Sequence, residues 1–270
     1  MNGPTRSGEL ALTAIALFLD VDGTLLELAA TPYAVSVSGD VRERLRGLSS
    51  AGGGAVALVS GRAIADLDAL FAPLKLPSAG LHGFELRGAS GGCRRRPLPS
   101  RAALEAARAA MLDLADRHAG LLVEDKRFAL ALHYREVPHL EDTVVKTMGN
   151  VANGLAGELE LQHGKMVVEL RPAGATKADA VAAFLAEAPF AGRLPIFMGD
   201  DLTDEPAFEL VNRLDGLSVV VGARRPSAAS ASLADVPAVH DWLAQLQAEP
   251  AAALHQLSAP GGSEHLRSQS

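Results

Sequence analysis

The fold of this chain is decided by Leu17-Phe-Leu-Asp20-Val-Asp22-Gly-Thr24-Leu25. An apolar run ends abruptly at two aspartates separated by one residue, and Gly-Thr follows. A buried strand that stops at carboxylates carries them at its C-terminal end, where open parallel sheets bind ligands. Two such carboxylates can contribute to a Mg²⁺ site, or act as nucleophile and proton donor. Taken alone, the stretch is better explained by two solvated turn residues, and the rest of the chain reverses this.

Composition limits the class of protein. The chain has 270 residues, of which 48% are hydrophobic, and a net charge of -7. Such an acidic chain is a poor general binder of nucleic acid or anionic membranes, so we expect neither as a partner. Cys93 is the only cysteine, which excludes an intramolecular disulfide and fits a reducing compartment. The apolar run at 10–19 meets Asp20 instead of a cleavage site, so we interpret it as a strand and expect a cytoplasmic protein.

The first third of the chain alternates strand and helix patterns. Apolar runs predict strands near 15–20 and 55–59, and helical periodicity predicts helices at 41–49 and 64–71. This alternation is typical of a parallel sheet covered by helices on both faces. The same pattern resumes after Pro172, with helices expected at 176–187, 204–213 and 237–247 and strands at 194–198 and 217–221.

The middle of the chain follows another pattern. After a Gly- and Arg-rich loop at 88–99, the expected elements are a helix at 102–118, strands at 121–125 and 128–134, a helix at 140–153, and strands at 158–162 and 166–171 around a turn at 163–164. This α-β-β-α-β-β order predicts an antiparallel sheet with helices on one face. We therefore expect an α/β core at 13–92 and 173–248, an inserted α+β domain at 93–172, and disordered tails at 1–12 and 249–270.

Polar side chains follow three of the expected core strands: Asp20 with Asp22, Ser60-Gly61-Arg62, and Gly199-Asp200-Asp201. Because the carboxyl ends of parallel strands meet at one edge of a sheet, these groups should converge. Carboxylates that lie so close repel one another unless a cation sits among them, and Mg²⁺ prefers oxygen ligands and often shares them with phosphate. With Mg²⁺ bound, Asp20 could attack phosphorus. Ser60, the amide near Gly61 and Lys177, which begins a helix, could hold the phosphoryl oxygens.

These residues resemble the motifs of the haloacid dehalogenase superfamily of phosphotransferases. Four motifs occur in the expected order: Asp20-Val-Asp22-Gly-Thr24, Ser60, Lys177, and Gly199-Asp200-Asp201-x-x-Asp204. The resemblance covers residues 13–248 and implies a doubly wound, Rossmann-like core with an inserted cap domain.

The resemblance also implies a role for each motif residue. Asp20 would be the nucleophile that becomes an aspartyl phosphate, and Asp22 would protonate the leaving oxygen and then activate water. Thr24 would orient these groups and, with Ser60, Gly61 and Lys177, bind the phosphoryl group. Mg²⁺ would be held by Asp20, the Asp22 carbonyl and Asp200, with support from Asp201 or Asp204.

The inserted domain should choose the substrate, because such a cap excludes water from the site. Strand alternation places Glu124 and Lys126 on one side of their strand, and Lys165, Val167, Glu169 and Arg171 on one side of the last cap strand. A face of charged side chains can hydrogen-bond many hydroxyls, which suits a sugar. From the pattern alone, a solvated outer face is about as well supported.

A narrower resemblance favours sugar binding over a solvated outer face. Five stretches of the sequence are similar to motifs of trehalose-6-phosphate phosphatases. They are Leu-Val-Ser60-Gly61-Arg62, Gly80-Leu-His82-Gly83-x-Glu85, Val-Glu124-Asp-Lys126, Glu169-x-Arg171-Pro172 and Gly-Asp-Asp-x-Thr203-Asp204-Glu205. The resemblance implies that Glu124, Lys126 and Glu169 bind the disaccharide, that His82 lines the cleft floor, and that Arg62 supports the Ser60 motif beside the substrate. One departure is Ala178, where many relatives have Gly.

The implied reaction is hydrolysis of trehalose 6-phosphate to trehalose and phosphate by a Mg²⁺-dependent monomer. Two alternatives stay open. The substrate could be another phosphorylated sugar or sugar acid, such as sucrose 6-phosphate or mannosyl-3-phosphoglycerate. The chain could also be a non-catalytic sugar-phosphate sensor, although the intact motif residues argue against this.

Overall fold

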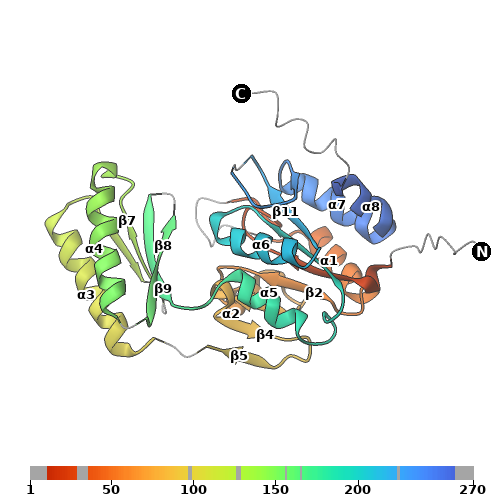
Figure 1. The fold of residues 1–270 in the computed structure, drawn as a ribbon, viewed down its shortest axis with the longest axis horizontal. Helices are drawn as coiled ribbons and strands as arrows, with labels where there is room; N and C mark the ends of the chain where they lie inside the picture. Colours follow the sequence, from red (N-terminus) through yellow and green to blue (C-terminus); the bar gives the residue numbers. More distant parts are fainter. Residues whose placement is uncertain are drawn as a thin grey trace, which may run out of the picture. The chain divides into compact units, whose positions relative to one another are not determined.

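The structure is a computed structural model that describes residues 11–28, 36–96, 99–125, 129–155, 157–164, 166–223 and 226–258. These residues form two compact units (Figure 1). The first unit, here called the core, comprises the described residues up to Arg94 together with those from Thr176 onward. The second unit, here called the cap, is the continuous segment Arg95–Ala175. Both boundaries lie within a few residues of the limits expected from the sequence.

Strands of the core form one eight-stranded sheet among the described residues. In spatial order they are β12 (Ala231–Leu233), β11 (Leu217–Val221), β10 (Leu194–Gly199), β1 (Ile15–Leu19), β2 (Val56–Val59), β3 (Ser78–Gly80), β4 (Glu85–Arg87) and β5 (Cys93–Arg95). Pairing is parallel from β12 to β3, and β4 runs antiparallel to β3. The carboxyl ends of β1, β2 and β10 therefore meet at one edge of the sheet.

Alternate residues of β1 enter two different hydrophobic clusters. Leu17 and Leu19 pack with helices α1 (Gly39–Ala51), α2 (Ile64–Phe71) and α7 (Val236–Ala248). Phe18 packs on the opposite face with α5 (Lys177–Leu185) and α6 (Glu205–Arg213). Helices thus cover both faces of a mostly parallel sheet, which confirms the doubly wound core predicted from the sequence.

The cap consists of a four-stranded antiparallel sheet and two helices (Figure 1). Its sheet has the order β6 (Leu122–Asp125), β7 (Leu130–His133), β9 (Val167–Pro172) and β8 (Leu159–Gly164). Helices α3 (Arg101–Arg117) and α4 (Glu141–Gly154) contact one face of this sheet and bury its apolar residues, among them Leu130, Leu132 and Val168. The α+β insertion is therefore present in the predicted order.

Several local predictions need correction. The expected loop at 88–99 contains the edge strand β5, and β8 continues through Gly164, so the turn lies later than expected. Part of the expected disordered tail is helix α8 (Pro250–Ser258), because Ala253 is buried and its carbonyl accepts a hydrogen bond from Trp242 Nε1 at 2.9 Å. Residues 1–10 and 259–270 of the two expected tails lie outside the described residues.

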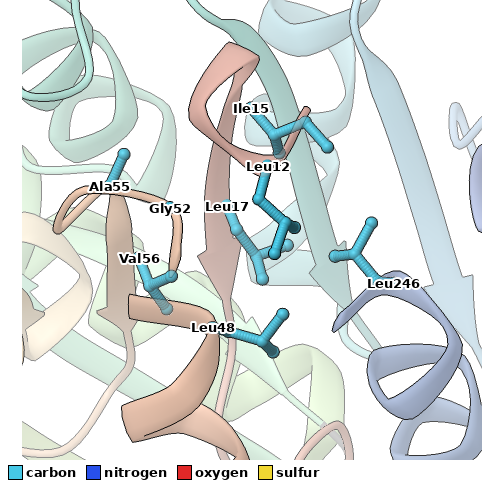
Figure 2. A pocket seen from close by; sticks show the side chains of 8 residues that line it. All are labelled: Leu12, Ile15, Leu17, Leu48, Gly52, Ala55, Val56 and Leu246. Atoms are coloured by element: carbon cyan, nitrogen blue, oxygen red, sulfur yellow. The ribbon is translucent and has the colours of Figure 1, made fainter. Parts of the chain in front are cut away.

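A small apolar pocket lies at the end of the core sheet opposite Asp20. Figure 2 shows its lining, which includes Leu12, Leu17, Leu48 and Leu246. The pocket holds about 10 Å³ and its walls are almost entirely apolar, so it is a packing defect and not a polar ligand site. Within the described part of the chain, no helix combines the length and apolar character that a bilayer-spanning segment needs.

Candidate active site

The aspartates that follow β1 lie in a tight turn. Asp20 continues the parallel ladder, because its N–H donates to the Met198 carbonyl at 2.9 Å, and its side chain is only 6% exposed. The chain then reverses: Leu25 N and Leu26 N both donate to the Val21 carbonyl at 2.9 Å. Thr24 in this turn is completely buried. Asp20 is thus rigidly presented at the carboxyl end of the central strand.

The end of β10 brings further carboxylates to the same place. Asp204 is fully buried and folds back, so that its Oδ2 accepts from Asp201 N at 2.9 Å. This close approach requires Gly199, because any side chain there would collide with Asp204. Carboxylate oxygens of Asp20, Asp200 and Asp204 all lie within 4.8 Å of one another. Of the four carboxylates predicted to converge, Asp20 and Asp200 belong to this group, and Asp204 is its third member in place of Asp22 and Asp201.

Lys177 is the ammonium partner of this carboxylate group. It opens α5 after Thr176, whose side chain forms a capping box with Asp179. Its Nζ lies 2.6 Å from Asp204 Oδ1 and 2.9 Å from Asp20 Oδ1, and the side chain is 2% exposed. A cation at a helix N-terminus opposes the helix dipole, so these two carboxylates stabilise Lys177 in that position.

Charge in the group is unbalanced, since three carboxylates share one ammonium. Burial, partly offset by Lys177, raises the pKa of Asp20 well above its usual value, and burial likewise raises the pKa of Asp204. Burial and the nearby Asp204 raise the pKa of Asp200 to about 6. Burial lowers the pKa of Lys177, but Asp20 and Asp204 outweigh this and hold it above its usual value. The group therefore favours an additional positive charge.

The residues after β2 form a second wall. Ser60 is buried, and its Oγ accepts from Arg62 N at 3.2 Å. The Arg62 guanidinium binds Asp22 through two hydrogen bonds, Nε to Oδ2 at 2.7 Å and Nη2 to Oδ1 at 2.6 Å. The hydrogen bond to Asp22 also raises the pKa of Arg62. The sequence predicts that Arg62 supports the Ser60 motif and binds substrate; in the structure its guanidinium binds the second aspartate of the Asp20 motif, and the substrate contact stays a prediction.

His82 lies against this second wall. Its backbone N–H donates to the Ser60 carbonyl at 2.9 Å. Its ring occupies the space beside Gly61, where a Cβ would lie 2.8 Å from the ring. Leu81 and His82 both have positive φ, 50° and 57°, which is an uncommon backbone conformation for residues with side chains. Glu85 accepts from Ile64 N at 2.9 Å and caps α2, a role the sequence did not reveal.

Candidate sugar-binding residues of the cap lie on the sheet face opposite its helices. Glu124 of β6 and Glu169 of β9 both flank Ala131 of β7. His133 Nε2 lies 2.8 Å from Glu124 Oε2, and Gln162 is paired with Glu169 across the strands. Sequence reasoning missed His133 and Gln162, although strand alternation from Ala131 and Glu160 points to both. Lys126 and Lys165 lie outside the described residues.

Comparison with known proteins agrees with this geometry. A sequence model described as trehalose-phosphatase matches residues 18–237. A probable trehalose-phosphate phosphatase of Sinorhizobium fredii is 47% identical over 222 residues, covering 82% of each chain. Trehalose-6-phosphate phosphatase of Escherichia coli K12 is 42% identical over 239 residues, covering 88% of each chain.

Solved structures show the same fold. The C-terminal domain of Candida albicans trehalose-6-phosphate phosphatase superposes with a TM-score of 0.75 at 22% identity, covering 87% of this chain and 92% of that one. Aspergillus fumigatus trehalose-6-phosphate phosphatase gives a TM-score of 0.66 at 26% identity, covering 86% and 92%. Structures of haloacid dehalogenase-type hydrolases share the fold as well. The match over most of the sequence shows that the chain belongs to the trehalose-phosphatase family.

Proposed function

We propose that this chain hydrolyses trehalose 6-phosphate to trehalose and inorganic phosphate, as its family and the names of its relatives suggest. The observation that carries the proposal is the buried Asp20 at the end of β1, grouped with Asp200 and Asp204 and bonded to Lys177. This is the arrangement that a carboxylate nucleophile for phosphoryl transfer needs, because the surrounding charges hold it in place and can neutralise phosphate.

Mg²⁺ fits the acidic group. All the candidate ligands are oxygen atoms, and three carboxylates, two of them buried, share the ammonium of Lys177. We propose that Asp20, the Asp22 carbonyl and Asp200 hold the ion, with Asp204 and Asp201 in support. When bound, Mg²⁺ would screen the repulsion between the carboxylates and the phosphate.

The protein groups then divide the chemistry. An Asp20 carboxylate oxygen forms a bond to phosphorus while the bond from phosphorus to the sugar oxygen breaks, which gives an aspartyl phosphate. Asp22 gives a proton to the leaving sugar oxygen and later removes one from the water that attacks the aspartyl phosphate. Ser60, the amide near Gly61 and Lys177 hold the phosphoryl oxygens throughout, and Thr24 orients the aspartates.

Specificity for the disaccharide is proposed to come mainly from the cap. Glu124, Lys126 and Glu169 of the cap and His82 of the core are proposed to bind the sugar. The support is the polar face formed by Glu124, His133, Gln162 and Glu169, which carries hydrogen-bonding groups in a pattern suited to a sugar. Phosphatases of sucrose 6-phosphate or mannosyl-3-phosphoglycerate are the alternative, since the same groups could bind other sugars.

Two further properties are proposed with this function. A cytoplasmic location fits the substrate class and the single exposed thiol of Cys93. A monomer is the expected state, and light scattering after size exclusion would test it.

The decisive experiment measures phosphate release from trehalose 6-phosphate, glucose 6-phosphate, sucrose 6-phosphate and mannosyl-3-phosphoglycerate, with and without Mg²⁺. We expect strong preference for the trehalose ester, dependence on Mg²⁺, and loss of activity in Asp20→Asn but not in Asp113→Asn, an exposed aspartate of α3. Preference for another ester would overturn the substrate. No turnover of any ester by the folded, Mg²⁺-loaded protein would favour a sugar-phosphate sensor.

A further inference from the structure

His240 of α7 contacts the turn that carries the catalytic aspartates, although 215 residues separate it from that turn in the sequence. Its Nε2 lies 2.8 Å from the carbonyl oxygen of Leu25. A carbonyl can only accept, so Nε2 must carry the hydrogen and donate it. Leu25 is completely buried, and a buried carbonyl needs such a partner.

The hydrogen bond from His240 is linked to the backbone of Asp22 through one peptide and one further hydrogen bond. The peptide that joins Leu25 to Leu26 is held at both ends, since its carbonyl accepts from His240 and its N–H donates to the Val21 carbonyl at 2.9 Å. The Val21 carbonyl belongs to the peptide that leads into Asp22. Two hydrogen bonds therefore separate the imidazole from the backbone that positions the Asp22 side chain.

At Gly23 of the same turn there is no space for a side chain. Gly23 has a φ of +77°, and a side chain there would collide with the Asp200 carboxylate. Its N–H donates to the Leu26 carbonyl at 2.7 Å. The turn thus contacts α7 at Leu25 and approaches the Asp200 carboxylate at Gly23, so a shift at Leu25 would change the spacing between Asp22 and the acidic group.

We propose that His240 is a positioning residue for this turn: it fixes the Leu25–Leu26 peptide and through it the orientation of Asp22. His240 does not contact the reacting atoms. The inference rests on the proposed function, because it assigns Asp22 the proton transfers. Misplacement of a catalytic group by about 1 Å can cost on the order of 100-fold in rate.

The test compares two side chains of similar length. Gln at position 240 can present an N–H donor where the ring nitrogen lies, whereas Met fills similar space without a donor. His255→Met, at an exposed position of α8, is the matched control for the same substitution. The readouts are kcat and KM for trehalose 6-phosphate and hydrogen exchange of the Leu25 and Leu26 amides.

We expect His240→Met to lower kcat by about tenfold or more while KM changes by less than about twofold, and His240→Gln to retain at least about a third of kcat. The Leu25 and Leu26 amides should exchange faster in His240→Met than in His240→Gln, and His255→Met should match the wild type. Equal kcat in the Gln and Met variants, or a Met variant that only unfolds at lower temperature, would overturn the proposal.

The proposal can still be tested if His240→Met does not fold or if the wild type is inactive. If His240→Met does not fold, His240→Asn takes its place, because the shorter amide cannot reach Leu25; a kcat equal to that of His240→Gln would then refute the role. If the wild type hydrolyses no trehalose 6-phosphate, the proposed function fails. Hydrogen exchange still tests His240 in that case, and equal Leu26 protection in the variants would refute its positioning role.

Discussion

Replacing Lys177 by Met should destabilise the core strongly. The side chain is 2% exposed and its ammonium contacts Asp204 at 2.6 Å and Asp20 at 2.9 Å, both of them buried. Its removal leaves these carboxylates without their cation, and breaking a buried ion pair in this way costs about 3–5 kcal/mol. Activity should be lost as well, since the same ammonium is proposed to hold the phosphoryl group.

The loss of stability should depend on pH with a definite sign. The pKa of Lys177 is raised, so its own stabilising contribution is complete below its ordinary pKa and is lost only at strongly alkaline pH. The pKa values of Asp20 and Asp204 are also raised, so protons replace the missing cation as the pH falls. Lys177→Met should therefore be less destabilising at pH 5 than at pH 7.5.

Urea unfolding followed by fluorescence would measure this effect, because Trp242 is the only tryptophan and is buried in α7 of the core. Lys75→Met is the control: Lys75 is 73% exposed and lies 3.9 Å from Asp68, so its loss should cost less than about 1 kcal/mol. A Lys177→Met protein within about 1 kcal/mol of the wild type at pH 7.5 would refute the view that this lysine neutralises the acidic group.

Three other predictions concern the turn that follows β1 and the residues beside it. Without Mg²⁺, the free energy of unfolding should fall as the pH rises from about 4 to 6, because the pKa of Asp200 is raised to about 6. Mg²⁺ should raise Tm more at pH 7.5 than at pH 5. An equal rise at both pH values would count against a site of ionised carboxylates. Gly23→Ala should cost about 1–3 kcal/mol and weaken Mg²⁺ binding, because φ is +77° and the new methyl group displaces Asp200; an unchanged Mg²⁺ titration would contradict this. Arg62→Gln should lower kcat, because it removes a contact with Asp22 worth about 1.5–3 kcal/mol. Arg62→Lys should retain part of the wild-type kcat. A rise in KM alone would instead indicate that Arg62 contacts the substrate.

Long strands that end in carboxylates could be predicted from the sequence. β1 and β10 are continuous apolar runs followed by aspartates, and both form where expected, next to each other. The three-residue strands β3, β4 and β5 lack enough residues for a period to appear, so their pairing depends on neighbours already in the sheet. Helix α8 was mistaken for a disordered tail because its apolar residues are mostly alanine, and Trp242 on α7 provides its partner.

The candidate site divides in the same way. The positions of Asp20, Ser60, Lys177 and Asp200 could be predicted because each follows a strand or opens a helix, and their roles stay predictions. Contacts between residues far apart in the sequence could not be predicted. Arg62 binds Asp22 across 40 residues, and His240 binds Leu25 across 215. Nothing in the local sequence of α7 marks His240 as a partner of the turn that follows β1.

The order of the strands also has a consequence for synthesis on the ribosome. β1 pairs with β10, which is translated roughly 180 residues later, while the cap is one continuous segment between them. At about 5–20 residues per second, the apolar β1 waits on the order of 10–35 s for this neighbour. We expect the cap to fold first during that interval, while the exposed first strand of the nascent chain is the segment that chaperones must shield from aggregation.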